Sequence, residues 1–229
     1  MKKMIVVLMV LVAGSVLAKS LDTGYEPEGL DELVKQKGTF NTTLIRPEAD
    51  FSRYTKLNPR QVSIVIRNPG EQELEAPTGR LIGSRSRGGV MPDWEAIGEL
   101  KQILDDTIVT ELDAKAEFEL VGNSGPGTLV LQATLTDAVF EQTTKIKNAD
   151  GEPVLVLSQG TIVFDLIDGE TGVIQARLGE RRKCQPSKYA TSTDSTLQWP
   201  CAGAWTEDAV TDLCQELKRV RGKGSSKSS

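Results

Sequence analysis

Alternating apolar and polar residues mark most of the strands expected in this chain. The clearest alternation begins at residue 128, where Leu129, Leu131, Ala133 and Leu135 would share one face of a strand. Further strands are expected over residues 61–66, 116–121, 153–167 and 172–182, with a short one over residues 40–45. Residues 168–172, Asp-Gly-Glu-Thr-Gly, have the composition of a hairpin turn between the last two long strands.

Two segments repeat apolar residues every three or four positions, which predicts amphipathic helices over residues 93–115 and 201–223. Asp93 is the expected N-cap of the first helix. The first stripe comprises Trp94, Ile97, Leu100, Ile103, Leu104, Ile108 and Leu112. The second comprises Trp205, Val210, Leu213, Cys214, Leu217 and Val220. Each helix therefore needs an apolar surface to cover its stripe.

The order strand, helix, four strands, helix predicts an α+β fold. A two-layer sandwich, with a mixed β-sheet and both helices packed on one face, covers both helical stripes with one sheet surface. The opposite sheet face would carry polar residues and meet water or a partner. Those residues are Gln132, Thr134, Thr136, Gln175 and Arg177.

Asp137 interrupts the apolar face of the strand that begins near residue 128. A catalytic carboxylate or a metal ligand would need a partner group, and no histidine or second acid is fixed near it by spacing. We therefore expect a structural role, as a β-bulge or as an acceptor of backbone hydrogen bonds at a bend.

The N-terminus has the layout of a secretory signal peptide over residues 1–18. Lys2 and Lys3 precede an apolar run over residues 4–12, and cleavage is expected after Ala18. Lys19 stands where a lipid-modified cysteine would have to be, so a soluble periplasmic protein is expected, with no transmembrane segment after cleavage. The other expected units are an extended arm over 19–60, one α+β domain over 61–221 and a flexible tail over 222–229.

Three cysteines follow the signal peptide. An oxidising compartment permits one disulfide and leaves one thiol over. Cys214 falls in the apolar stripe of the second helix, so we pair Cys184 with Cys201, while Cys201 with Cys214 stays open.

Composition excludes several function classes. A net charge of −5 gives no footprint for nucleic acid. The chain has no histidine and no Cys-x-x-Cys pair, so we expect no metal, no cofactor and no Ser-His or Cys-His catalytic system. An enzyme built on carboxylates or lysine is the least favoured interpretation, because no constellation of such groups converges.

Two basic segments are candidates for contacts. Arg80, Arg85 and Arg87 lie among glycines and serines in a long loop over residues 68–91, where guanidinium and backbone N–H groups suit an anion or a partner. Residues 181–183, Arg-Arg-Lys, would serve peripheral membrane association. Three basic residues fall short of the roughly four to eight in lipid-binding clusters, so an exposed strand end is favoured.

Three stretches carry a family resemblance: "RPEADFSRY" from residue 46, "GPGTLVLQATLTDA" from residue 125 and "GTIVFDLIDGETGVIQA" from residue 160. Together they resemble a bacterial family of exported envelope proteins, domain of unknown function 3313. The resemblance implies a periplasm-facing domain, often a lipoprotein, with no assigned activity. This chain departs from it by lacking the lipid-acceptor cysteine.

The expected function is a non-enzymatic interaction module of the bacterial cell envelope. It would bind another envelope protein or a polymer through the polar sheet face or the 68–91 loop. The alternative is an anion or small-ligand carrier that uses the arginine-rich 80–90 loop.

Overall fold

The computed structural model describes residues 27–66, 92–147, 153–183, 199 and 201–225. The strands are β1 (Val34–Lys35), β2 (Thr42–Ile45), β3 (Lys56–Pro59), β4 (Ser63–Ile64), β5 (Glu119–Leu120), β6 (Thr128–Lys147), β7 (Pro153–Asp168) and β8 (Ile174–Lys183). The helices are α2 (Trp94–Lys115) and α3 (Ala202–Ser225), with two short 3₁₀ helices, η1 (Leu30–Glu32) and η2 (Phe51–Arg53).

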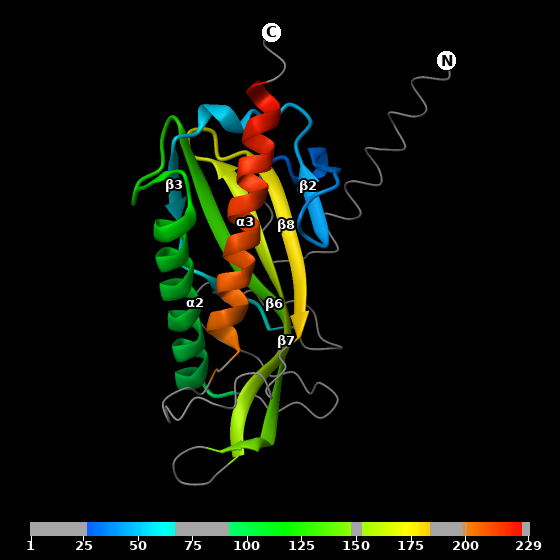
Figure 1. Cartoon of the computed structure of the whole chain (residues 1–229), viewed down its shortest axis with the longest axis vertical. Coiled ribbons are helices and arrows are strands. Elements are labelled where there is room, and N and C mark those ends of the chain that lie inside the picture. Colours follow the sequence, from blue (N-terminus) through cyan, green and yellow to red (C-terminus); the bar gives the residue numbers. More distant parts are fainter. Residues whose placement is uncertain (1–26, 67–91, 148–152, 184–198, 200, 226–229) are drawn as a thin grey trace, which may run out of the picture.

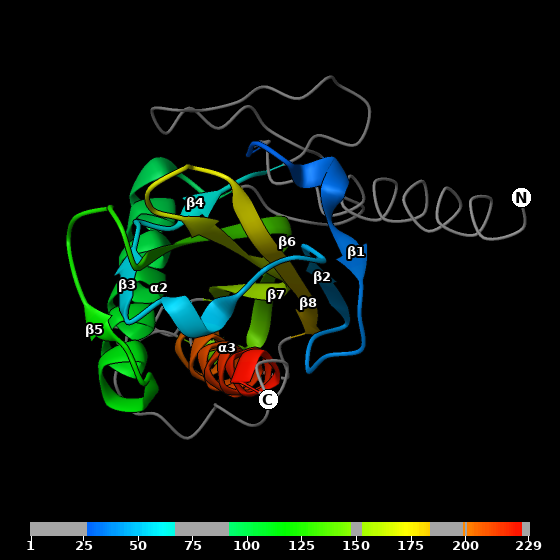
Figure 2. The same cartoon turned by 90° about the horizontal axis from the view of Figure 1, so that it is seen from above.

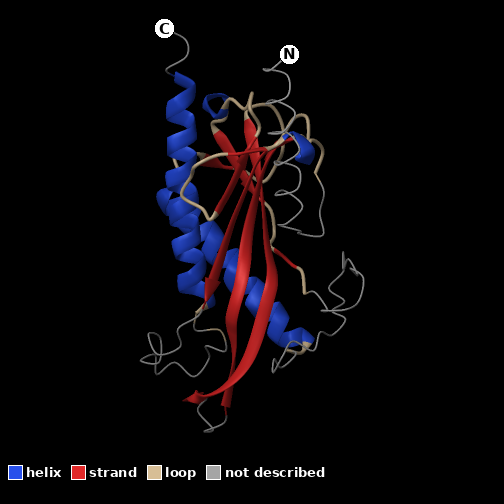
Figure 3. Cartoon of the chain, turned by 90° about the vertical axis from the view of Figure 1, so that its right-hand side faces the viewer, coloured by secondary structure: helices blue, strands red, loops and turns tan. Residues whose placement is uncertain are grey.

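The strands form one mixed sheet in the order β1-β2-β8-β7-β6-β3-β5, and β4 also pairs with β6. The pairs β3–β6, β4–β6 and β3–β5 are parallel, and the others are antiparallel. Figures 1 and 3 show both helices on the same side of this sheet. The predicted α+β sandwich, with a mixed sheet and two helices on one face, is confirmed.

One hydrophobic core fills the space between the helices and the sheet. The side chains that point inward from α2 and β6 are those that the periodicity selects, including Leu100, Leu104, Leu129 and Leu131, each at most 2 % exposed. Trp94 is the exception: it lies in the first turn of α2 and is 48 % exposed. The Asp93 carboxylate accepts a hydrogen bond from the Ala96 N–H, so the predicted N-cap is confirmed.

The opposite face of the sheet carries a second, smaller core. Leu30 and Leu33, at η1, pack there with side chains from four strands or their ends: Leu44, Val130, Ile167 and Ile174. Seen from above, η1 and α3 lie on opposite sides of the sheet (Figure 2). The N-terminal segment is thus a second cover for the sheet.

Residues 27–60 belong to this folded unit, although the sequence pattern suggests an extended arm over 19–60. They supply β1, β2 and β3, and β3 makes a parallel pair with β6 from Lys56↔Thr128 to Pro59↔Leu131. In this segment the sequence pattern shows only the strand near residue 42, because β1 and β3 have only two and four residues and little alternation of apolar and polar positions.

Candidate functional site

The residues predicted for anion contact and one half of the predicted disulfide lie outside the described residues. These are Arg80, Arg85, Arg87 and Cys184. Cys201 is buried at the start of α3. Cys214 is a buried free thiol in the stripe of α3, and burial raises its pKa above the ordinary value. The pairing of Cys184 with Cys201 stays a prediction, and the role of Cys214 as a small core residue is confirmed.

The polar face of the sheet does not meet water as the pattern suggests. Thr134, Thr136, Gln175 and Arg177 are each at most 6 % exposed. The expectation of an open, polar binding face is therefore wrong for these residues. Because this face is buried, its polar side chains need hydrogen-bonding or charged partners within the sheet itself.

The centre of this face is a buried ion pair between β7 and β8. The Arg177 guanidinium donates from Nε to Asp165 Oδ1 at 2.6 Å and from Nη2 to Oδ2 at 2.8 Å, and both side chains are 1 % exposed. The two residues are directly opposite each other in the ladder. Burial raises the pKa of Asp165, and the guanidinium opposes this shift. The pair therefore satisfies two buried charges and fixes the β7–β8 register.

Asp168, at the end of β7, is the acceptor of a second buried network. The Tyr54 hydroxyl donates to Oδ2 at 2.6 Å, and Arg53 forms an ion pair with the same oxygen. Oδ1 accepts from the Glu170 N–H at 3.0 Å and the Thr171 N–H at 2.8 Å. Burial opposes ionisation, but these bonds hold the Asp168 pKa at about 2.

This network joins two of the stretches that carry the family resemblance. "RPEADFSRY" supplies Arg53 and Tyr54, and "DGETG" supplies Asp168 and Thr171. Earlier in the first stretch, the Arg46 Nε donates to the Ile174 carbonyl at 3.0 Å. The resemblance is thus built on residues that tie the N-terminal segment to the β7–β8 hairpin, which is a structural role.

Asp137 forms the predicted β-bulge. Its φ angle is +52°, and the β6–β7 register shifts between Thr136 and Val139. The Asp137 side chain is exposed, and its Oδ2 accepts a hydrogen bond from the Thr161 hydroxyl at 3.4 Å. The interruption in the apolar series therefore marks a change of register.

Beyond this bulge, β6 and β7 continue as a two-stranded ribbon, which we call the arm (residues 139–147 and 153–159). Their pairing extends to Lys147↔Pro153. In contrast, β8 pairs with β7 only as far as Gln159, and β4 pairs with β6 only as far as Leu135. Figures 1 and 3 show the arm projecting past the ends of both helices. Among the strands that the structure describes, both outer edges of the arm lack a neighbour.

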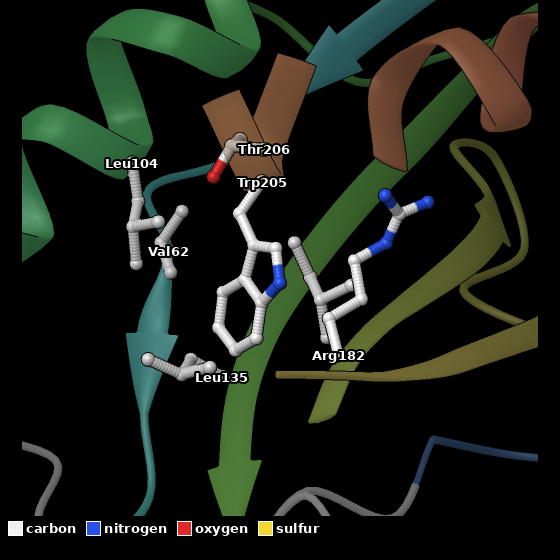
Figure 4. Close-up of a pocket in the computed structure, with 7 residues that line it drawn as sticks. Val62, Leu104, Leu135, Arg182, Trp205 and Thr206 are labelled. Carbon is white, nitrogen blue, oxygen red and sulfur yellow. The ribbon is translucent and has the colours of Figure 1, made fainter. Parts of the chain in front are cut away.

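A small pocket lies between the helices and the sheet (Figure 4). Apolar side chains from four elements or their ends form most of its wall: Val62, Leu104, Leu135 and Ile162. Trp205 of α3 and Arg182 of β8 complete it, with Thr206. Gly160 permits the approach of Trp205, since a Cβ there would lie 3.2 Å from the indole and 2.8 Å from Leu135.

Two N–H donors of this pocket have no acceptor among the described residues. They are the indole Nε1 of Trp205 and the Nε of Arg182, both inaccessible to solvent. Trp205 as a whole is 9 % exposed. Figure 4 shows the indole nitrogen on the edge of the ring that faces Arg182. Buried donors without an acceptor cost folding free energy.

The other end of Arg182 is occupied by three carboxylates. Its Nη2 lies 2.8 Å from Glu180 and 2.7 Å from Asp212, and Nη1 lies 3.1 Å from Asp208. One positive charge thus faces three negative charges, and the surroundings of the pocket are negative. Spacing does not reveal this cluster, because β8 ends at Lys183 and α3 begins only at Ala202.

Within the described ranges, no three acidic or cysteine side chains are placed to hold a metal ion. No helix in that part of the chain combines the length and apolar character that a bilayer crossing needs.

No family model and no curated protein matches the chain, so the resemblance to domain of unknown function 3313 is not confirmed. Solved structures that are similar include the PelC dodecamer from Paraburkholderia phytofirmans, at 12 % identity and a TM-score of 0.34, covering 79 % of this chain and 96 % of that chain. Hypothetical protein CT253 from Chlamydia trachomatis is 9 % identical, with a TM-score of 0.36, and the match covers 72 % of this chain and 98 % of that chain. Protein XCC0632 from Xanthomonas campestris, described as family-model DUF330, is 14 % identical, with a TM-score of 0.34, and the match covers 80 % of this chain and 94 % of that chain. Similarity this low carries no argument about what this chain does.

Proposed function

We propose that this chain is a non-enzymatic interaction module of the bacterial cell envelope, and that it binds another protein through the arm. The observation that carries the proposal is the length of the β6–β7 ribbon beyond β4 and β8. Phe140 and Leu157 at the base of the arm are buried in the core, but beyond them the arm is a two-stranded ribbon, and isolated hairpins are marginal in water. Within the residues that the structure describes, no other strand explains its length.

Strand addition is the binding mode that suits such a ribbon. An unpaired strand edge presents a row of N–H and C=O groups, to which an extended segment of another protein can add. The arm sequence includes Lys145 and Lys147. Lysine in the sequence of an edge strand generally opposes indiscriminate strand pairing. The partner that we propose is a different protein that contributes an extended segment.

The place of action that we propose is the periplasm, and the N-terminal pattern supports it. The mature protein would begin at Lys19. Mass analysis of the protein purified from the periplasmic fraction tests this. An uncleaved N-terminus at Met1 in a cytoplasmic fraction would contradict export.

A shortened arm tests the proposed function without disturbing the core. An Asn-Gly turn can join Glu141 to Val156, which face each other in the ladder, and it removes residues 142–155. The buried residues at the base of the arm, Phe140 and Leu157, stay in place. The matched control replaces Thr143 and Thr144 with alanine and keeps the full length.

Cells that express each variant are treated with a protein crosslinker, and the complexes are compared by size. We expect the shortened variant to lose the heteromeric complexes that the full-length control retains, with the same urea midpoint for both. Complexes that persist after shortening would show that the partner binds elsewhere.

A further inference from the structure

The two strands of the arm differ in composition. Over residues 153–159, β7 has the sequence Pro-Val-Leu-Val-Leu-Ser-Gln and carries no charged residue. The facing part of β6, residues 139–147, includes Glu141, Lys145 and Lys147. Charged residues are common on the edge strands of sheets, where they oppose further pairing, whereas a short continuous apolar run is typical of a fully buried strand. In the arm, β6 therefore has the composition of an edge strand and β7 that of an interior strand.

Burial at the base of the arm shows the same difference. Val156 and Leu157 are consecutive, so their side chains point to opposite faces of β7, and they are 2 % and 1 % exposed. The residues of β6 that face them in the ladder are Glu141, which is exposed, and Phe140, which is buried. At this level β7 is thus covered on both faces and β6 on only one.

In the arm, β7 nevertheless has only one neighbouring strand among the described residues. Its pairing with β8 ends at Gln159↔Lys183, while its pairing with β6 continues to Pro153. Residues 154–158 therefore have one edge without a partner strand in that part of the chain. These five residues span about 17 Å, so an added strand of ordinary length would match this edge.

We infer that the partner adds one strand to this edge of β7, along residues 154–158 and in line with β8, which occupies the same side of β7 up to Gln159 (Figure 1). The inference rests on the proposed function and specifies which edge of the arm binds and what binds there. An uncharged, apolar extended segment fits this edge, because a charged side chain beside Val156 or Leu157 would be buried without a counter-ion. β6 then remains the outer strand of the arm.

A second copy of this chain fits the same edge less well. In a symmetric pair, two antiparallel β7 strands would face each other, and Gln159 of each copy already pairs with Lys183. Pairing between copies would therefore stop at the same five residues on both chains. An extended segment of another protein has no such limit on its own side, so a different protein is the favoured occupant.

A charge placed on each strand of the arm tests the choice of edge. Leu155 and Gln142 face each other in the ladder, so Leu155→Glu and Gln142→Glu place the same charge at the same level of the arm. Full-length variants are treated with an amine-directed crosslinker in cells. Leu155→Glu should reduce the yield of the heteromeric complex about fivefold or more, because the carboxylate would lie beside the added strand. Gln142→Glu, the matched control, should leave the yield unchanged, because β7 separates it from that strand.

Amide hydrogen exchange, followed by nuclear magnetic resonance on the purified protein, gives a second test that needs no variant. With β6 as the only neighbour, alternate amides of residues 154–158 donate to β6 and should exchange slowly, while the amides between them should exchange fast. Slow exchange at all five amides of the monomer would mean that this chain itself covers the edge, and would overturn the inference even if Leu155→Glu fails to fold.

The outcomes separate this inference from the proposed function. A complex lost in Gln142→Glu but retained in Leu155→Glu would place the partner on β6 and overturn this inference alone. A complex that is lost when the arm is shortened, but changes equally or not at all in the two charge variants, would also overturn only the choice of edge. Complexes that persist when the arm is shortened would contradict the proposed function itself. Crosslinked products that contain only this chain would identify a second copy and overturn both.

Discussion

Replacing Asp168 with asparagine tests the structural role assigned to the stretches that carry the family resemblance. The carboxylate receives hydrogen bonds from Tyr54, Glu170 and Thr171 and an ion pair from Arg53. Asp168 is 4 % exposed, so solvent weakens its hydrogen bonds to Tyr54 and the turn little, whereas the Arg53 side chain is half-exposed and its ion pair is screened by water. An asparagine side chain would keep one acceptor for the turn but would lose the charge and the oxygen that faces Tyr54.

The magnitude follows from the shift in the Asp168 pKa. A fall from 3.8 to about 2 corresponds to roughly 2 kcal/mol of folding stability at neutral pH. Because the pKa is lower in the folded state, this stability is present above pH 4 and is lost as the pH falls through 2. We therefore expect Asp168→Asn to lower the free energy of unfolding by about 2 kcal/mol at pH 7 and by clearly less near pH 2.5.

Urea unfolding at several pH values, followed by tryptophan fluorescence, measures both effects. Tyr54→Phe is the matched control, since it removes one donor and leaves the carboxylate ionised. It should cost about 1 kcal/mol and retain most of the acid dependence. If Asp168→Asn and the unmodified protein lose stability in parallel as the pH falls, Asp168 does not supply the acid-sensitive part and the reasoning is refuted.

Three further predictions concern the sheet and its cysteines. Asp137→Gly should be close to neutral, because glycine accepts a positive φ, whereas Asp137→Ala should lower the free energy of unfolding by about 1 kcal/mol; equal costs would contradict the bulge. Asp165→Ala should cost roughly 3–5 kcal/mol, because it leaves a buried guanidinium uncompensated, while the exposed Asp208→Ala should cost under about 1 kcal/mol by thermal unfolding; similar values would contradict a buried pair. Peptide mapping of the unreduced protein should find Cys184 linked to Cys201, and a bridge to the remaining cysteine would refute that pairing.

Periodicity predicts the long elements well because each one buries a single face. The stripes of α2 and α3 and the alternation along β6 identify most of the main core, and the break at Asp137 correctly marks the bulge. Trp94 shows the limit at a helix end, where a side chain in register with the stripe stays exposed.

Periodicity fails where short or polar segments find distant partners. β3 has four residues, and its place in the sheet depends on pairing with β5 and β6, which lie far along the chain. Polar residues such as Thr134 indicate a solvent-facing strand surface, but the Asp165–Arg177 pair permits the burial of that surface. The two residues of an ion pair across strands have no fixed separation in the sequence, so the sequence alone does not reveal the pair.

The candidate binding features depend even more on three-dimensional arrangement. The arm is visible in the sequence only as two strands, since its projection depends on how early β4 and β8 end. Similarly, the sequence pattern predicts Trp205 as a core residue of α3, and only the structure shows that its N–H has no acceptor in the described ranges.

Site-specific photo-crosslinking in living cells tests most directly the claim that the arm binds another protein. A photoreactive residue is placed in the arm at Thr143 or Thr144, and the control is placed at Gln102, an exposed position on α2. The account predicts discrete adducts with a protein other than this chain at the arm positions, and none at the control. Adducts only at the control, or adducts only between copies of this chain, would contradict it.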